Sequence, residues 1–323
     1  MSKHPAHTLT LVADFGGTNT RVALADGTEL LPQTVRKYRN HGVPDLETVV
    51  RRYLSDEGGV DCAGACIAVA GPVREGVGEM TNIDWSVDRG ALARATSAKN
   101  VAILNDLQAQ AHALGHLNAA ALRQVKSGTQ PSADAAKLVI GIGTGFNAAP
   151  LFRTQGGPLV PPSESGHVSL PIRNAADLRL ADYIKAEHGF PAIEDVLSGR
   201  GLERIYHWLG HEAGDARTKS AADIMAGVSD GFDPRAEKAG GVFVRILGTV
   251  AGDLALIHLP FGGIYLSGGV ARSIAPHLDR LGFAAAFRDK GRFSGFMDNF
   301  SISVIEDDSA ALIGCACYLA AQN

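Results

Sequence analysis

The sequence has few of the residues that hold small secreted or metal-dependent domains together. Only 4 of its 323 residues are cysteine (Cys62, Cys66, Cys315 and Cys317), and all stand among apolar or small residues. Such surroundings favour buried thiols over disulfides, and the spacings C-x3-C and C-x-C have no histidine beside them. We therefore expect neither a disulfide framework nor a zinc site.

An excess of positive charge and a long apolar run are also missing. The formal net charge is −4, whereas a protein that binds nucleic acid needs a basic face. The N-terminal stretch MSKHPAHTLT lacks the apolar segment of a signal peptide, and no run approaches the roughly 18 apolar residues that span a membrane. We expect a cytoplasmic protein with neither nucleic acid nor membrane as a partner.

Glycine, by contrast, is abundant. The 38 glycines show no collagen-like period, so they indicate many tight turns, some of which could hold a ligand against the backbone. The length, with 46% hydrophobic and 20% charged residues, suits a well-packed protein of two lobes.

Apolar runs and turn residues predict the secondary structure. Buried strands are expected at residues 8–13, 65–70, 100–104, 137–140 and 262–267, and helices at 46–53, 107–117, 176–188, 240–258 and 310–321. Two of the strands lead through glycine-containing turns into a second strand, near Asp14 and near Gly141. These paired units predict two lobes of similar design that face one ligand. We place a small α/β domain at 1–112, to which the last helix (305–323) returns, and a large α/β domain at 113–304.

The first turn, in the sequence DFGGTN, offers groups that suit a phosphate. Its glycines let backbone N–H groups converge on an anion, and Thr18 and Asn19 add side-chain donors. Asp14 ends a strand beside this turn and could hold Mg²⁺ through water. The alternative is an ordinary hairpin in which the aspartate accepts hydrogen bonds from the turn.

The second turn, in the sequence GIGTG from Gly141 to Gly145, offers the same chemistry. Neither turn contains a lysine or fits G-x-x-x-x-G-K-[ST], so neither is a P-loop. Backbone dipoles and a metal ion would therefore have to offset the phosphate charge. A plain turn is again the alternative, although two such turns in one chain weaken it.

Asn105 and Asp106 follow an expected strand, at the carboxyl end where α/β sheets usually carry their site residues. An aspartate there can accept the proton of an attacking hydroxyl. The alternative is that Asp106 is the N-cap of the helix that follows. Position alone does not separate the two readings.

Two further segments could bind the hydroxyl groups of a polyol. In SESGH, Glu164 and His167 stand three residues apart in a turn, and Glu194 begins EDVLSGRGL. The alternatives are a structural histidine and a carboxylate at a helix start. Asn82 and Trp85, in MTNIDW, could flank a cleft, but a half-buried tryptophan is the simpler reading.

With these residues in view, the chain resembles the bacterial glucokinase family along nearly its whole length. The matching stretches, in order, are LVADFGGTNTRVALAD, CIAVAGPV, MTNIDW, ILNDLQAQ, GIGTGF, SESGHVSLP, EDVLSGRGL, FGGIYLSGG and GFAAAFRDKGRF. So many blocks in one order are far more specific than a single glycine turn.

The resemblance implies a two-lobed actin-like (ribonuclease H-like) ATPase fold with a central interdomain cleft. It implies ATP with Mg²⁺ as the phosphoryl donor, D-glucose as the acceptor, and a homodimer. Asp106 would be the base that acts on the 6-hydroxyl, and the sugar would be held by Asn105, Asp106, Glu164, His167 and Glu194. The nucleotide would be held by Ala13, Asp14, Phe15, Gly16, Gly17, Thr18, Asn19, Gly143, Thr144 and Gly145, with Gly268 and Gly269 near the adenosine.

The chain departs from the family pattern at a few supporting positions. Asn147 stands where the family usually has a glycine or another small residue, Ser163 and Ser165 replace glycines around Glu164, and the pair 309–310 is Ser-Ala where Asn-Pro is common. The five sugar-binding side chains are kept, so we read the chain as catalytically competent.

Three alternatives are weighed against this resemblance, and the absence of a zinc motif disfavours the first of them. The related repressor/open-reading-frame/kinase sugar kinases carry a cysteine-rich zinc motif after a similar Gly-His, and here no cysteine follows Gly166-His167 closely. A kinase of different hexose or donor specificity is the second alternative. A non-catalytic, sugar-sensing protein on the same scaffold is the third.

Overall fold

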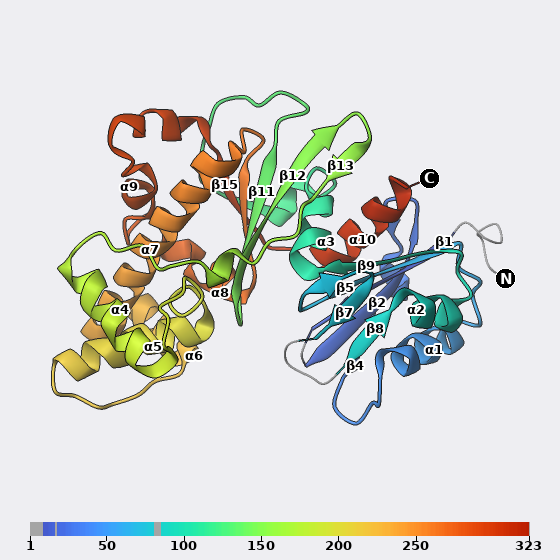
Figure 1. The fold of residues 1–323 in the computed structure, drawn as a ribbon, viewed down its shortest axis with the longest axis horizontal. Coiled ribbons are helices and arrows are strands. Elements are labelled where there is room, and N and C mark those ends of the chain that lie inside the picture. Colours follow the sequence, from blue (N-terminus) through green and yellow to red (C-terminus); the bar gives the residue numbers. More distant parts are fainter. Residues whose placement is uncertain (1–8, 17, 81–84, 323) are drawn as a thin grey trace. The chain divides into compact units, whose positions relative to one another are not determined.

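The computed structural model describes residues 9–16, 18–80 and 85–322, which divide into two compact units. Unit 1 takes its residues from Met1–Ala119, Thr154–Pro162 and Asp307–Asn323, and unit 2 from Ala120–Arg153 and Ser163–Glu306. Each unit combines a mixed β-sheet with helices (Figure 1). The α/β class predicted from the sequence is therefore confirmed.

The sheet of unit 1 begins with an antiparallel hairpin and continues with parallel strands. Its strand order is β3-β2-β1-β5-β9, and β4 pairs with β2. The strands are β1 (Leu9–Phe15), β2 (Asn19–Asp26), β3 (Glu29–Leu30), β4 (Arg36–Arg39), β5 (Gly64–Val69) and β9 (Asn100–Asn105). A smaller sheet contains β6 (Val73–Arg74), β7 (Val77–Glu79) and β8 (Ser86–Asp88).

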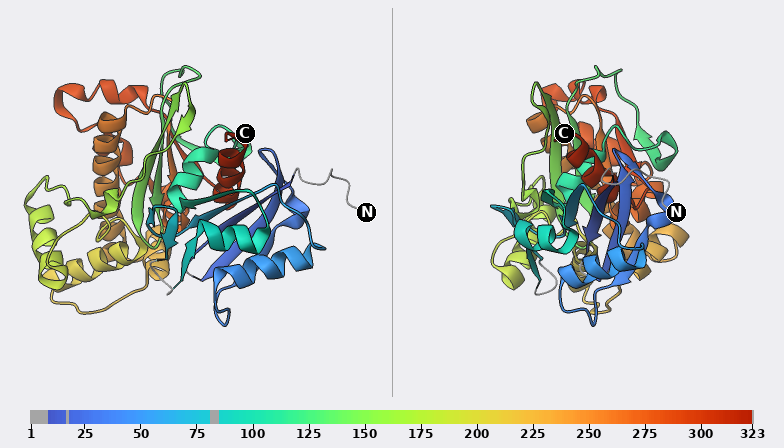
Figure 2. Two further views of the ribbon diagram at one scale, coloured as in Figure 1. Left: turned by 45° about the vertical axis from the view of Figure 1, so that its right-hand side comes forward. Right: turned by 90° about the vertical axis from the view of Figure 1, so that its right-hand side faces the viewer.

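Helices cover both faces of this larger sheet, as Figure 2 shows. Helices α1 (Leu46–Asp56) and α2 (Arg89–Thr96) pack on one face, and α3 (Asp106–Ala113) and α10 (Ala310–Ala320) on the other. Successive side chains of a strand point to opposite faces. Thus Leu11 and Phe15 of β1 join the cluster of α1 and α2, whereas Val12 joins the cluster of α10.

Helix α10 lies so close to α3 that it depends on a glycine. A Cβ atom at Gly314 would lie 1.6 Å from the backbone oxygen of Ala109. Because that neighbour is backbone, Gly314→Ala is expected to push α10 off α3 and to cost more than about 3 kcal/mol, at or beyond the upper end of ordinary overpacking. The measurement is the thermal unfolding midpoint of the purified variant.

Gly241→Ala is the matched control for this change. Gly241 also lies within a helix, but no heavy atom comes within 4 Å of a Cβ built there. Alanine at such a site is expected to be neutral or to stabilise by up to about 1 kcal/mol. Equal midpoints for the two variants would show that α10 does not need the close approach.

The sheet of unit 2 repeats the arrangement of the first. Its order is β10-β15-β14-β11-β12, continued by β13, with β11 and β12 antiparallel and β11, β14 and β15 parallel. The strands are β10 (Leu122–Lys126), β11 (Lys137–Ile142), β12 (Phe146–Thr154), β13 (Gly157–Leu159), β14 (Ile264–Ser267) and β15 (Ile302–Ile305). The order β12-β11-β14-β15 corresponds to β2-β1-β5-β9. The two units of similar design expected from the sequence are therefore present.

The helices of unit 2 bury one continuous apolar core. They are α4 (Ala175–His188), α5 (Gly199–Glu212), α6 (Ala221–Asp230), α7 (Pro234–His258), α8 (Gly269–Ile274) and α9 (Phe283–Arg288). Helix α7 is long and apolar enough to cross a membrane, but 67% of its most apolar window is buried within the protein. That burial is typical of a core helix.

Most predicted elements are found, with shifted ends. Helix α7 begins at Pro234, six residues before the expected 240, because Asp233 caps it and a proline suits the first turn. Helix α3 ends at Ala113 rather than 117, where Gly115 adopts a φ of 107°. The start of the first expected strand, at Thr8, lies outside the described residues.

Candidate functional site

In unit 1 the register of the sheet brings two predicted segments to one edge. Phe15 of β1 pairs with Val69 of β5, and Val69 pairs with Asn105 of β9, all in parallel. The carboxyl ends of the three strands are therefore level. Since neighbouring strands lie roughly 4.8 Å apart, the turn after β1 and the Asn105–Asp106 pair are about 10 Å apart along this edge.

The turn after β1 is held by Asn40, a residue that no sequence pattern indicates. Asn40 is buried, and its Nδ2 donates to the Gly16 carbonyl (2.6 Å) while its backbone N–H donates to the Thr18 carbonyl (3.0 Å). The Thr20 hydroxyl donates to Asn40 Oδ1 at 2.7 Å. The N–H of Gly16 donates to the Asn19 carbonyl at 3.1 Å, and Gly17 lies outside the described residues.

Asp14 lies beside this turn in a partly buried position. Burial raises the pKa of its carboxyl group to about 6, opposed by the nearby Arg21 and reinforced by Asp308. Arg21 pairs with Asp308, with Nη2 and Oδ2 3.1 Å apart. A carboxylate whose charge is disfavoured by burial gains from a cation beside it.

The raised pKa of Asp14 predicts how the substitution Asp14→Asn changes stability with pH. Between about pH 4 and pH 6 the unfolded carboxyl is ionised while the folded one is still protonated, so wild-type stability falls as pH rises through this window. The asparagine variant lacks this loss. Its free energy of unfolding is expected to exceed that of the wild type by up to about 3 kcal/mol at pH 8 without ligand, and to approach it below about pH 4, where the carboxyl is protonated in both states. Thermal unfolding across pH checks this, and a constant difference would contradict it.

Asn105, not Asp106, caps helix α3. The Asn105 side chain accepts from the Leu107 N–H (2.9 Å), and Gln108 Oε1 accepts from the Asn105 N–H (3.2 Å), which completes a capping box. Asn105 Nδ2 also donates to the Gly71 carbonyl at 3.0 Å. The N-cap reading of Asp106 was thus wrong by one residue. Asp106 is the first helical residue, partly buried, with its Oδ1 accepting from the Leu107 N–H at 2.8 Å.

In unit 2 the turn after β11 is held by backbone hydrogen bonds and has free space on one side. The Gly143 N–H donates to the Gly145 carbonyl, and the Gly199 N–H donates to the Gly143 carbonyl, each at 2.9 Å. A Cβ atom at Gly143 or Gly269 would meet nothing within 4 Å, whereas one at Gly268 would lie 2.3 Å from the Ile142 carbonyl oxygen. Gly268 is therefore required by close packing, and Gly143 and Gly269 have free space beside them. Thr144 is exposed.

Glu194 reaches this turn from far along the chain. Its Oε2 accepts from the Phe146 N–H at 2.9 Å, and a Cβ atom at Gly145 would lie 2.4 Å from that oxygen. The Ser198 hydroxyl donates to the Glu194 carbonyl at 2.8 Å and caps helix α5, which begins only at Gly199. Glu194 is therefore not a helix-start carboxylate. The structure places it against the second glycine turn.

The segment from Ser163 to His167 lies beside Glu194. The Glu194 N–H donates to the Gly166 carbonyl at 2.9 Å, and a Cβ atom at Gly166 would lie 2.1 Å from the Phe146 carbonyl oxygen. Glu164 and His167 are exposed, and the His167 N–H donates to the Glu164 carbonyl at 3.1 Å. Unit 2 thus brings together the second turn, Glu194 and the segment that carries Glu164 and His167.

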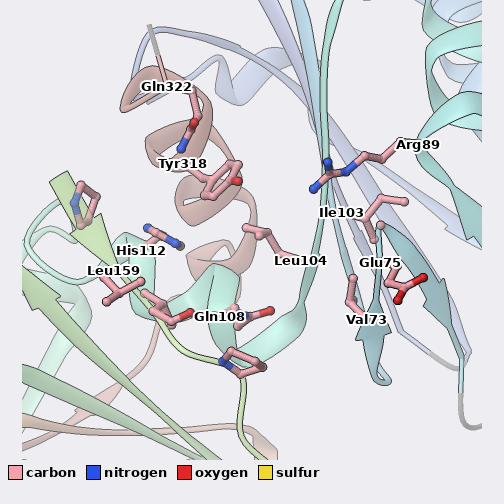
Figure 3. Close-up of a pocket in the computed structure, with 14 residues that line it drawn as sticks. Val73, Glu75, Arg89, Ile103, Leu104, Gln108, His112, Leu159, Tyr318 and Gln322 are labelled. Carbon is pink, nitrogen blue, oxygen red and sulfur yellow. Dashed lines mark hydrogen bonds between the residues drawn. The ribbon is translucent and has the colours of Figure 1, made fainter. Parts of the chain in front are cut away.

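A separate pocket of about 660 Å³ lies in unit 1, and none of the predicted site residues lines it. Figure 3 shows on its wall Gln108 and His112 of α3, Tyr318 of α10, and Gln322, which follows α10. Burial lowers the pKa of His112 to about 4, and its ring meets the Tyr318 ring edge-on, with centroids 5.1 Å apart. Within the described part of the chain, no three histidine, cysteine, aspartate or glutamate side chains form a metal-binding group. The four cysteines are free and buried.

Two equivalent α/β units, each with a glycine turn in its antiparallel hairpin (β1–β2 and β11–β12), define an actin-like ATPase fold.

The sequence profile of the family described as Glucokinase matches residues 11–322. The glucokinase of Brucella abortus biovar 1 (strain 9-941) is 33% identical over 311 residues, covering 95% of this chain and 90% of the relative. That of Saccharophagus degradans is 31% identical over 314 residues, covering 96% and 97%. A solved glucokinase from an Antarctic psychrotroph superimposes with a TM-score of 0.86 at 30% identity, covering 97% of this chain and 98% of that one. The chain belongs to the glucokinase family.

Proposed function

We infer that this protein catalyses the ATP-dependent phosphorylation of D-glucose, and we propose the 6-hydroxyl as the acceptor in the first step of glycolysis. The observation that carries the proposal is the level edge of the unit 1 sheet, which places Asp106 about 10 Å from the turn after β1. That separation leaves room for a sugar hydroxyl beside Asp106 and for the phosphoryl group that is transferred from a nucleotide held at the turn.

The proposed roles follow from the groups that each unit presents. Asp106 accepts the proton of the sugar hydroxyl and orients it, with Asn105 beside it. The other sugar hydroxyls form hydrogen bonds with the carboxylates of Glu164 and Glu194 and with the imidazole of His167. Glu164 and His167 are exposed. The phosphates are held by backbone N–H groups at residues 13–19 and 143–145, and the adenosine near Gly268 and Gly269. The cleft expected from the sequence stays a prediction.

Magnesium belongs to the proposal because neither glycine turn contains a lysine to offset the phosphate charge. Asp14 would hold the ion through water, and its raised pKa fits a carboxylate that gains from a cation. When bound, Mg²⁺ neutralises charge on the phosphates. We also propose that the enzyme is a cytoplasmic homodimer, whose oligomeric state analytical ultracentrifugation tests. Limited proteolysis tests the expected domains, 1–112 with the last helix (305–323) and 113–304, from which the compact units differ in that Thr154–Pro162 belongs to unit 1.

The deciding experiment measures ADP release by the purified protein with MgATP and a panel of hexoses. Release that depends on glucose, with glucose 6-phosphate as product, is the expected result. Stronger ADP release with another hexose would change the assigned sugar. Phosphoryl transfer only from polyphosphate would change the assigned donor. Glucose binding without ADP release would identify a sugar sensor instead.

A further inference from the structure

We propose that Asn147 is a positioning residue that fixes the sugar-binding segment Ser163–His167 and thereby sets the affinity for glucose. The inference rests on the proposed function for its effect on glucose, but its structural part stands on the contacts of unit 2 alone. Asn147 touches none of the reacting groups assigned above. It acts through the segment that carries Glu164 and His167.

The Asn147 side chain bonds to both residues that flank Glu164. Its Nδ2 donates to the Ser163 carbonyl, and its Oδ1 accepts from the Ser165 N–H (3.0 Å) and the Ser165 hydroxyl (3.1 Å). The Ser163 hydroxyl approaches the same oxygen at 3.4 Å. Because a carbonyl can only accept and a backbone N–H can only donate, these two backbone partners fix which end of the amide faces which residue.

The strand that carries Asn147 is itself fixed on the second glycine turn. Asn147 pairs with Gly141 across the β11–β12 hairpin, and the preceding Phe146 donates to Glu194 while its carbonyl packs against Gly166. Adjacent residues of β12 therefore hold the sugar-binding segment at two points. The second glycine turn and the segment that carries Glu164 and His167 therefore share β12 as a support.

The same contacts explain three departures from the family pattern at once. Ser163 and Ser165 lie far from Asn147 in sequence, yet each bonds to its side chain, so the polar groups introduced at position 147 find partners at 163 and 165. Restoring glycine or alanine at 147 alone would leave the Ser163 carbonyl and Ser165 N–H without this partner. Those groups would then have to find water, and Glu164 would lose its fixed backbone on both sides.

The test compares Asn147→Ala, Asn147→Asp and a control, Asn299→Ala. Alanine removes all of these side-chain bonds, whereas aspartate keeps an acceptor for Ser165 but loses the donor to Ser163. Asn299 makes a bond of the same kind, from Nδ2 to the Phe296 carbonyl at 2.8 Å, in the same unit. We expect the KM for glucose to rise about 10-fold in Asn147→Ala and less in Asn147→Asp, with kcat and the KM for ATP within about 3-fold of wild type. Asn299→Ala is expected to leave all three values within about 2-fold.

Backbone hydrogen exchange of the unliganded proteins supplies a second readout that needs no substrate. Exchange of residues 163–167 is expected to be at least about 10-fold faster in Asn147→Ala than in wild type or Asn299→Ala. Unchanged exchange, or an unchanged glucose KM in an active enzyme, would overturn the proposal, as would equal losses in kcat and both KM values. Faster exchange in a protein that does not phosphorylate glucose would refute the proposed function and leave the positioning role standing.

Discussion

Asp106→Asn is expected to lower kcat for glucose phosphorylation by about 10²- to 10⁴-fold, the range associated with loss of a general base. Asparagine keeps an oxygen that can accept from the Leu107 N–H, as Asp106 Oδ1 does at 2.8 Å. The start of α3 should therefore persist, and the change isolates the charge. Steady-state turnover at saturating glucose measures the loss, and calorimetry is expected to give a Kd for MgATP within about 3-fold of wild type.

Asp88→Asn is the matched control for this experiment. Asp88 belongs to the same unit and caps α2 by accepting from the Ala91 N–H at 2.7 Å. Asparagine is an equally good N-cap, so both stability and turnover should be unaffected. If Asp106→Asn retained a tenth or more of the wild-type kcat, Asp106 would not be the base.

Glu194→Gln is expected to raise the KM for glucose by about 10- to 100-fold. The amide oxygen can still accept from the Phe146 N–H, which Glu194 Oε2 does at 2.9 Å, so the second glycine turn keeps its support. What is lost is the charge-assisted bond to sugar hydroxyls, which is worth about 1.5–3 kcal/mol. Initial rates over a range of glucose concentrations give the KM.

Glu194→Ala separates the two roles of this side chain. It also removes the acceptor for Phe146, so it is expected to raise the KM for ATP as well as that for glucose. Glu212→Gln is the control, because Glu212 pairs with Arg179 on the surface of unit 2, away from the residues that hold the glycine turn. A wild-type KM for glucose in Glu194→Gln would remove Glu194 from the sugar site.

Local sequence patterns predict the strands and turns that carry the site, because each of these elements depends on residues that are neighbours in the chain. The hairpin β1–β2 and the strand β9 are signalled by apolar runs that end at glycines or at Asn105. The capping box of Asn105 and Gln108 was also readable, as were Asp233 and Pro234 at the start of α7. Such capping residues set the end of a helix, whereas apolar periodicity sets only its middle.

Contacts between distant segments could not be read in this way. Nothing near Asn40 indicates that it supports Gly16, and nothing near Gly145 indicates that Glu194 lies against it. Such pairs are set by how strands and loops pack, and no short-range pattern encodes that packing. Glycines required by a close approach, such as Gly166 and Gly268, also look the same in sequence as glycines beside open space, such as Gly143.

The membership of α10 in unit 1 affects how the chain is made. This helix packs on β1 and β5, and its Cys315 thiol points at the Ala13 carbonyl from 3.8 Å. The ribosome produces those strands early and α10 only after nearly all of unit 2. The part of this apolar sheet face that α10 covers, next to α3, therefore stays exposed while unit 2 is synthesised, and exposed apolar surface of this kind favours association with other chains or with chaperones.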